Sequence, residues 1–200
     1  MPAQSKPVLI ILAGPAGVGK STLCDRLVTQ VPGFERVITA TTRPPRIGEV
    51  NGRDYHFLTD AQFDAKLAAD EFLEWARVHD KDRRYGTLKT AVLNRLPHVS
   101  LIANVDVQGV RSIRAAAKNL PLLQNKLVTI FVAPDSLDVL RERMQGRGPM
   151  SKEELAQRLQ SAEFELAERN SYDYVIHSAS KEQDFRALLA YWEQARQKLA

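Results

Sequence analysis

The chain has 200 residues, of which 44% are apolar, and this fits one compact domain with a sizeable core. A net charge of +4, from 28 basic and 24 acidic residues, suits a protein that binds either nucleotides or nucleic acid, so the charge alone does not distinguish these two ligands. The single cysteine, Cys24, excludes an intrachain disulfide and a cysteine-based metal cluster, and we expect it in the core. No stretch approaches the roughly 20 apolar residues that cross a membrane, and the start lacks a signal-peptide pattern, so we expect a cytoplasmic protein without a membrane partner.

The first structured segment carries the most specific motif. Residues 14–21 read G-P-A-G-V-G-K-S, a full match to the P-loop pattern, and they follow the apolar run 8–13. We expect a buried strand, a tight turn and then a helix that opens at Ser21, with Leu23 and Leu27 on one face. This strand-loop-helix context is the one that the motif requires.

Each residue type in the loop suits a triphosphate. The glycines let backbone N–H groups approach phosphate oxygens at a helix N-terminus, Lys20 reaches the terminal phosphates, and the Ser21 hydroxyl is placed to bind magnesium. The alternative is a glycine-rich turn without a ligand, which has no need of lysine and serine at this spacing. The expected triphosphate-binding residues are Gly14, Pro15, Ala16, Gly17, Val18, Gly19, Lys20, Ser21 and Thr22.

Further apolar runs occur at 101–105, 128–133 and 174–176, with helical patterns between or after them. This alternation favours an α/β fold with a parallel sheet covered by helices. The P-loop then lies at the carboxyl end of the first strand, where such sheets bind ligands.

Between residues 37 and 96 the pattern changes to shorter pieces. We expect small strands near 37–41, 55–58 and 71–76, and a short helix near 60–69. Inserted after the P-loop helix, such a subdomain is a natural substrate holder.

Residues 135–169 show a helical pattern that breaks at the G-R-G-P of 146–149. Ser151 and Glu154 form a capping-box signature for the second helix. A glycine-proline hinge between two arginine-bearing helices predicts a mobile lid. The last helix, near 181–199, is expected to pack on the core through Phe185, Leu188, Leu189 and Trp192.

A second anion site is predicted within residues 39–55. Arg43 and Arg46, separated by two prolines, can present rigid donors to a phosphate dianion, and Tyr55 and Tyr85 can add hydroxyl donors. The alternative is that the arginines are solvated loop charges and the tyrosines pack half-buried.

Glu74, Thr39 and Thr87 are the candidates for reading a base. A carboxylate can accept from the N1–H and N2 amino groups of guanine together, whereas the N1 of adenine would meet it acceptor to acceptor. The alternative for Glu74 is an exposed charge on an amphipathic strand.

These motifs together closely resemble those of guanylate kinases. The family pattern T-T-R-x-P-R-x-G-E-x-x-G-x-D-Y is present without a gap at 41–55, and 72–76, 85–87, 107–109 and 143–148 also match, in order. The resemblance implies the three-layer P-loop NTPase α/β fold and phosphoryl transfer from ATP to GMP, and also dGMP, with Mg²⁺. It implies one domain, comprising a core at about 7–38, 97–134 and 170–200, a GMP-binding subdomain at about 39–96 and a lid at about 135–169.

The resemblance also assigns roles. It implies that Arg143, Arg147 and Arg158 close over the transferred group, although a solvated helix face would explain the first two as well. The expected catalytic residues are Lys20, Arg43, Arg46, Arg143, Arg147 and Arg158. The expected GMP-binding residues are Thr39, Arg43, Arg46, Tyr55, Glu74, Tyr85, Gly86, Thr87, Asn104 and Asp106, with Ser21 as the metal ligand.

The chain departs from the family pattern at three places. Asn104 stands where the first of two acidic residues is usual, so one charge near Lys20 and the metal is lost. His177-Ser178 replaces an expected asparagine, and we expect His177 on the surface or at the donor base. Arg84 replaces a tyrosine, and we expect it at a charged hairpin tip, with an extra phosphate contact as the secondary alternative.

Two other functions remain open at this stage. A non-catalytic guanylate-kinase-like module that binds phosphopeptides would not need the intact Gly19-Lys20-Ser21. A related kinase that phosphorylates a ribose phosphate would keep the P-loop and lid, but it would not need Glu74 and Thr39. No motif supports a nucleic-acid partner, and the sequence indicates no oligomeric state.

Overall fold

A five-stranded parallel sheet forms the centre of the molecule. The computed structural model describes residues 6–77, 83–146 and 151–198. Across the sheet the order is β2 (Phe34–Arg36), β7 (Ser100–Asn104), β1 (Leu9–Ala13), β8 (Leu127–Pro134) and β9 (Tyr174–Ser178). All neighbouring strands run parallel. The predicted α/β fold with a parallel central sheet is confirmed.

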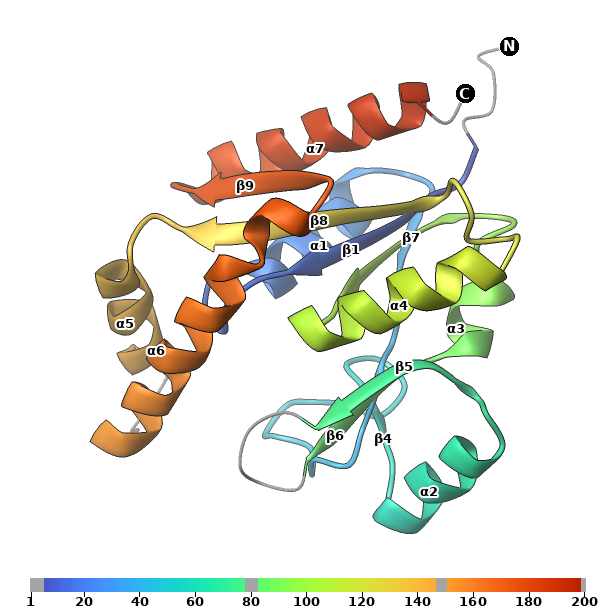
Figure 1. Ribbon diagram of the computed structural model, residues 1–200, viewed down its shortest axis with the longest axis horizontal. Coiled ribbons are helices and arrows are strands. Elements are labelled where there is room, and N and C mark those ends of the chain that lie inside the picture. The colour runs from blue at the N-terminus through green and yellow to red at the C-terminus, as the bar shows by residue number, and fades with distance from the viewer. Residues whose placement is uncertain (1–5, 78–82, 147–150, 199–200) are drawn as a thin grey trace.

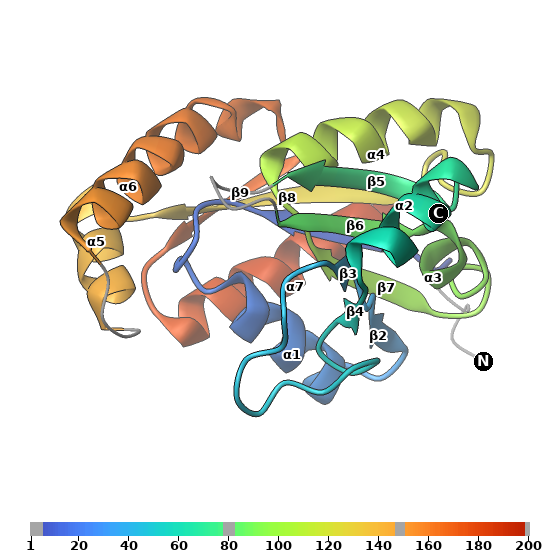
Figure 2. The ribbon, with the colours of Figure 1, turned by 90° about the horizontal axis from the view of Figure 1, so that it is seen from below.

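Helices cover both faces of this sheet and make three layers (Figures 1 and 2). Because strand side chains alternate, Ile10 and Leu12 join one core and Leu9 and Ile11 the other. On one face lie α1 (Lys20–Gln30) and α7 (Lys181–Lys198), and on the other α3 (Lys89–Leu93) and α4 (Val107–Asn119). Cys24 and the α7 stripe of Phe185, Leu188, Leu189 and Trp192 belong to the first core, as predicted.

The sequence reasoning missed the edge strand β2 of the central sheet. β2 has only three residues, two of them charged, and its apolar Phe34 alone is buried. Its place in the sheet comes from pairing with β7. The strand expected over 37–41 is shorter than predicted, because only Ala40–Thr41 (β3) pair with neighbouring strands.

A smaller four-stranded sheet is inserted after β2. Its order is β4 (His56–Phe57), β3, β6 (Arg84–Leu88) and β5 (Phe72–Arg77). The predicted short helix, α2 (Asp60–Ala68), begins with a complete capping box between Thr59 and Gln62. It packs over this sheet through Phe63, which stacks on Phe72.

The two predicted lid helices are α5 (Leu137–Gln145) and α6 (Lys152–Ala167), and a 3-10 turn (Arg169–Ser171) leads back to β9. Ser151 caps α6 by accepting from the Glu154 N–H, as predicted, while the Glu154 carboxylate pairs with Arg158. The hinge residues 147–149 lie outside the described residues. In Figure 1, α5 and α6 lie at the opposite end of the molecule from α2.

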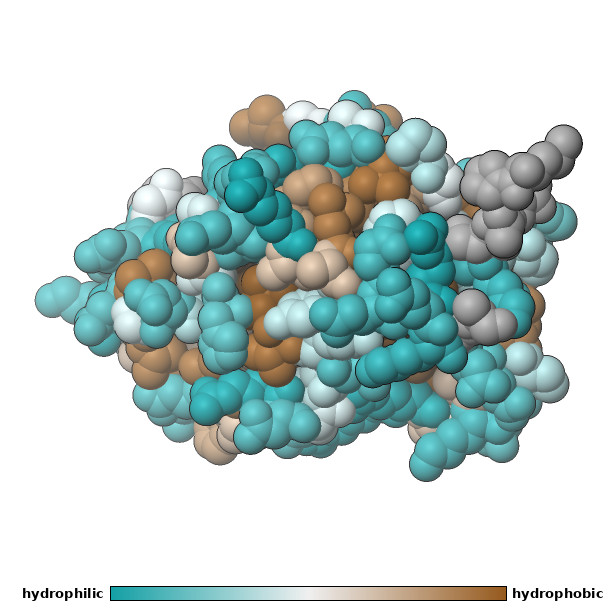
Figure 3. All heavy atoms as spheres, turned by 90° about the horizontal axis from the view of Figure 1, so that it is seen from above, coloured by the Kyte–Doolittle hydropathy of each residue, from teal (hydrophilic) through white to brown (hydrophobic). Residues whose placement is uncertain are grey.

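Within the described part of the chain, no helix is long and apolar enough to span a bilayer. On the face seen in Figure 3, hydrophilic residues cover most of the surface and hydrophobic residues show through in patches between them. His177 is exposed at the end of β9, as one of its two predicted roles requires.

Candidate active site

One cleft, of about 640 Å³, brings most of the predicted site residues together. Its walls come from the P-loop, the inserted sheet, the segment after β7 and helix α6. The predicted residues that line it are Gly14, Ala16, Gly17, Gly19, Lys20, Ser21, Thr22, Thr39, Arg43, Arg46, Tyr55, Glu74, Tyr85, Gly86, Asn104, Asp106 and Arg158. Pro15, Val18, Thr87 and Arg143 lie beside the lining, and Arg147 lies outside the described residues.

The P-loop is shaped by glycines in the left-handed region. Gly14 has a φ of 133°, and a Cβ there would lie 2.2 Å from the Val132 carbonyl oxygen of β8. Only glycine therefore allows the loop to leave β1 this close to β8. Gly19, with a φ of 113°, is the N-cap of α1. The first backbone N–H groups of α1, which have no partner within the helix, therefore lie next to the P-loop.

Lys20 crosses the loop that precedes it. Its ammonium donates to the carbonyl oxygen of Gly14 and to that of Pro15, the latter at 2.9 Å. These bonds hold the positive charge inside the curve of the loop, where a phosphate would add stronger, charged acceptors.

Beyond the loop lies the end of β7. The Asn104 side-chain amide lies 3.5 Å from the Ser21 hydroxyl, which is a long hydrogen bond. Asp106 caps α4 by accepting from the Gly109 N–H at 2.7 Å. The predicted metal ligand, the exposed Ser21 hydroxyl, thus has an amide and a carboxylate on the same side of the cleft.

Arg43 is the buried centre of the predicted phosphate site. Its side chain is 4% exposed, and its guanidinium donates to the Glu49 carboxylate at 2.9 Å and to the Pro44 carbonyl at 2.7 Å. It also lies 5.4 Å from the ring centre of Tyr55. The alternative of a solvated loop charge is wrong for Arg43, whereas Arg46 is exposed at the rim.

Glu49 ties both arginines into one turn. Its carboxylate also accepts from the Arg46 backbone N–H at 2.7 Å. Burial alone would raise the pKa of Glu49, but this bond and the Arg43 guanidinium outweigh it and hold the pKa below its usual value. The charged pair therefore persists at neutral pH, and the loop keeps its shape before any phosphate binds.

The two predicted tyrosines meet at the same place. Tyr55 and Tyr85 are half-buried and pack edge to face with ring centres 6.0 Å apart. Burial, and then Tyr85, raise the pKa of Tyr55, so its hydroxyl stays protonated and can donate.

Glu74 is a buried carboxylate, 7% exposed, at the closed end of the cleft. It accepts from the Thr87 hydroxyl at 2.6 Å. Burial raises its pKa to about 7, Thr87 opposes this shift, and Asp106 adds to it. The alternative of an exposed charge is wrong, because β5 turns Glu74 toward α4, so that a Cβ on Gly109 would lie 2.7 Å from the carboxylate.

The predicted lid arginines lie in two different places. Arg158 lines the cleft from α6 and pairs with Glu154 at 2.7 Å. Arg143 lies on α5, where its guanidinium donates to the Val18 carbonyl oxygen at 3.3 Å. Arg143 is therefore in contact with the P-loop and does not line the cleft.

Comparison with known proteins explains this arrangement. The family model described as guanylate kinase matches residues 5–195. The chain belongs to the guanylate kinase family. The guanylate kinase of Corynebacterium glutamicum is 42% identical over 172 residues, covering 84% of this chain and 85% of that protein. The guanylate kinase of Corynebacterium jeikeium is 38% identical over 169 residues, covering 84% and 86%.

A solved structure agrees. The crystal structure of guanylate kinase from Anaplasma phagocytophilum matches with a TM-score of 0.73 and 25% identity over 96% of this chain and 88% of that one. A gluconokinase from Sinorhizobium meliloti, 18% identical with a TM-score of 0.54 over 98% of this chain and 97% of that one, shares the fold alone. The three-layer α/β fold is that of guanylate kinase and P-loop NTPases.

The guanylate kinase cleft holds one carboxylate that sequence reasoning missed. Glu165 of α6 lines it half-buried, and its carboxylate makes no hydrogen bond or ion pair with the described residues. Burial raises its pKa, Lys20 opposes the shift and Asp106 adds to it. A spacing of seven from Arg158 puts Glu165 on the same helix face, a signal that the sequence did contain.

Arg84 corrects a prediction. It is not at a charged hairpin tip but is 7% exposed at the start of β6, where it pairs with Asp60 at 2.7 Å and with Asp64. Its guanidinium also lies 4.6 Å from the ring centre of Phe63. Arg84 therefore fastens α2 to the inserted sheet.

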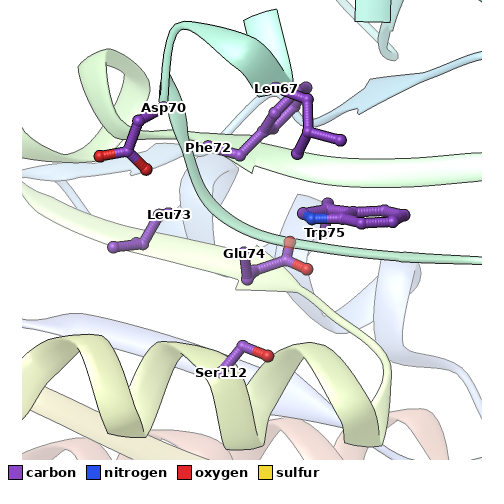
Figure 4. A pocket seen from close by; sticks show the side chains of 7 residues that line it. All are labelled: Leu67, Asp70, Phe72, Leu73, Glu74, Trp75 and Ser112. Carbon is purple, nitrogen blue, oxygen red and sulfur yellow. The ribbon is translucent and has the colours of Figure 1, made fainter. Parts of the chain in front are cut away.

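A second, smaller pocket of about 260 Å³ lies outside the cleft (Figure 4). It is lined by Leu67, Asp70, Phe72, Leu73, Glu74, Trp75 and Ser112. In Figure 4, Ser112 projects from α4 toward Glu74. Glu74 thus lines both the cleft and this smaller pocket.

Proposed function

We propose that the chain transfers the terminal phosphoryl group of ATP to GMP and forms ADP and GDP. The observation that carries this proposal is that one cleft combines a P-loop with a buried arginine and a buried carboxylate, Arg43 and Glu74. The first holds a donor triphosphate, and the other two suit the phosphate and the base of a second nucleotide. We propose dGMP as a second acceptor, because the groups assigned above contact only the phosphate and the base, which GMP and dGMP share.

Base choice follows from the acceptors that Glu74 offers. Its carboxylate can take the N1–H and N2 amino protons of guanine, and the Thr87 hydroxyl fixes its orientation. AMP would leave this buried carboxylate facing an acceptor, and an unsatisfied buried charge is costly. Thr39, half-buried at the same end, is proposed as the partner of the base oxygen.

The residues near the P-loop fit magnesium bound together with ATP. Among the described residues there is no cluster of three or more His, Cys, Asp or Glu side chains that would hold a metal alone. Mg²⁺ commonly takes only one or two protein oxygens and completes its shell with phosphates and water, and the Ser21 hydroxyl suits that role. When bound, it would neutralise phosphate charge during transfer.

The protein's part in the reaction is alignment and positive charge. Lys20 is proposed to hold the donor phosphates, and Arg43 and Arg46 the acceptor phosphate, so that the two face each other across the cleft. Arg143, Arg147 and Arg158 are proposed to surround the moving phosphoryl group after the lid closes. Fixed cations at this point stabilise charge that spreads in the transition state.

These roles divide the chain into parts. We assign the acceptor to a subdomain at about 39–96 and the closing movement to a lid at about 135–169. The core is proposed to comprise about 7–38, 97–134 and 170–200. The compartment proposed is the cytoplasm, and no nucleic acid or membrane partner is invoked.

Two other functions have less support. A phosphopeptide-binding module of this family has no use for Lys20, whose ammonium is held inside the P-loop. A ribose-phosphate kinase has no use for a buried Glu74.

One experiment separates the three functions. ADP release is measured with ATP and magnesium against GMP, dGMP, AMP, UMP and ribose phosphates. We expect turnover with GMP and dGMP and little with the others. Equal rates with GMP and AMP would contradict the base assignment, and binding of GMP without turnover would contradict an enzyme.

A further inference from the structure

A chain of polar contacts connects helix α7 to the P-loop. Asp184, in the first turn of α7, is 7% exposed and accepts from the Ser178 hydroxyl at 2.8 Å and from the Ala179 N–H at 2.9 Å. The Ser178 hydroxyl in turn lies 3.4 Å from Arg143, whose guanidinium donates to the Val18 carbonyl oxygen. Ser178 and Asp184 do not line the cleft.

Capping of α7 does not require this buried carboxylate. Ser180 already accepts from the Gln183 N–H at 3.2 Å and thus supplies the helix N-cap. Burying a carboxylate costs free energy unless charge or hydrogen bonds compensate it. The guanidinium of Arg143, one hydroxyl away, supplies the complementary charge.

The hydroxyl of Ser178 connects Asp184 to Arg143. It has one proton, and because that proton is donated to Asp184, only lone pairs face Arg143. Both guanidinium hydrogen bonds of Arg143 come from Nη1, and its other guanidinium nitrogens have no hydrogen-bond partner among the described residues. The guanidinium is therefore anchored at one end, with donors left for phosphate oxygens.

The contact with Val18 fixes a peptide plane of the P-loop. None of the described peptide bonds is cis, so the Val18 C=O and the Gly19 N–H point in opposite directions. Arg143 holds the carbonyl toward α5, away from the cleft that Gly19 lines. The Gly19 N–H is thereby turned toward the cleft, where a donor phosphate would need it.

We propose that Asp184 is a positioning residue of the donor site: through Ser178 it holds Arg143 on the Val18 carbonyl, and so keeps the Gly19 N–H directed at the donor phosphate. This rests on the proposed function only in that the P-loop takes ATP. A purely structural role at the β9–α7 turn would change stability but not the affinity for ATP.

The test measures ATP binding by calorimetric titration of the full chain with ATP and magnesium, without an acceptor. Asp184→Asn is expected to weaken ATP binding about tenfold, the loss of one hydrogen bond in a charged chain, and to leave GMP binding unchanged. Ser180→Ala, the matched control in the same helix turn, is expected to lower stability without changing ATP affinity. The amide NMR signal of Gly19 should shift in Asp184→Asn and stay in place in Ser180→Ala.

Two further variants test the proposal even if Asp184→Asn fails to fold or has more than one effect. Ser178→Ala removes the middle link and should reproduce the loss of ATP affinity even if Asp184→Asn does not fold. In an Arg143→Ala background, Asp184→Asn should cause no further loss. An unchanged ATP affinity in Ser178→Ala, an equal loss in Ser180→Ala, or a full additional loss in the Arg143→Ala background would overturn it. A wild-type chain that binds ATP without phosphorylating GMP would refute the proposed function and leave this comparison intact.

Discussion

Glu74 is buried, and burial disfavours the charged form of its carboxylate. Burial raises its pKa to about 7, from 4.5, against the pull of Thr87. The folded state therefore binds more protons than the unfolded state between these two values, and the contribution of Glu74 to the free energy of unfolding falls as pH rises from about 4.5 to about 7.

Glu74→Gln should remove this dependence. Relative to the wild type, the variant should gain up to about 3 kcal/mol in free energy of unfolding between pH 5 and pH 8.5. Urea unfolding of both proteins at the two pH values measures the difference. Thr87→Val is a useful companion, since loss of the hydroxyl should raise the pKa of Glu74 further and make the decline in free energy of unfolding larger than in the wild type. Parallel pH curves for wild type and Glu74→Gln would contradict the assigned burial.

Asn104 is an uncharged residue beside the proposed metal position. Its amide reaches the Ser21 hydroxyl at 3.5 Å and carries no charge. Asn104→Asp should place a negative charge beside Lys20 and the proposed metal position, and so lower the magnesium concentration needed for half-maximal turnover. A charge interaction of about 1 kcal/mol corresponds to about fivefold. The measurement is a magnesium titration of steady-state ADP release, and an unchanged midpoint would show that the amide serves as well as a carboxylate.

For single residues, the sequence predicted chemical roles better than burial. Lys20, Arg43 and Glu74 were predicted as site residues because their chemistry matched a motif, and the structure brings them to one cleft. Arg84 was misread, because four neighbouring charged residues indicate an exposed hairpin tip. Its burial depends on Phe63 and Asp60, which are more than 20 residues away and contact it only in the folded chain.

Helix α2 depends on Arg84 for its attachment. The arginine is 9% exposed in its side chain, while its partners Asp60 and Asp64 are 76% and 62% exposed. Arg84→Met keeps much of the volume but removes these bonds and the contact with Phe63, and should lower the free energy of unfolding by about 1–3 kcal/mol.

The matched control for Arg84 is Asp64→Asn. This change weakens one exposed pair and should cost less than about 1 kcal/mol. Urea unfolding of the two variants under the same conditions measures both losses in free energy of unfolding. Equal losses would mean that the exposed carboxylates, and not the buried arginine, fasten α2 to the sheet.

Among the elements, those with strong local patterns were predicted and those fixed by partners were not. β1, β7, β8 and β9 have apolar runs, and helices such as α7 have a clear stripe. β2 has only Phe34 buried, and its two charged residues give no strand pattern. It exists because β7 offers an open edge, and this is information that only the assembled sheet contains.

Across the whole molecule, the two halves of the cleft rest on different layers. The P-loop is held between β1, β8 and α5, and the acceptor residues belong mostly to the inserted sheet. Arg143 and Arg158 come from two helices of the proposed lid, so the proposed closure would bring them toward both halves. The sequence motifs predicted the two halves, and the structure adds that Arg143 starts from the donor side.

This separation predicts independent losses of binding. A ligand at 100 times its dissociation constant adds about 2.7 kcal/mol to stability, which corresponds to about 5–10 °C in Tm for a domain of this size. Lys20→Ala removes the ammonium that spans the P-loop, so it should lose the Tm increase given by ATP and magnesium and keep that given by GMP. Glu74→Gln should lose the increase given by GMP and keep that given by ATP. Thermal unfolding of the two variants with each ligand, with the ligand-free Tm of each as its own reference, measures all four shifts. If either variant lost both increases while its ligand-free Tm stayed within 2–4 °C of the wild type, about the effect of 1 kcal/mol, the two sites would have to form a single coupled unit.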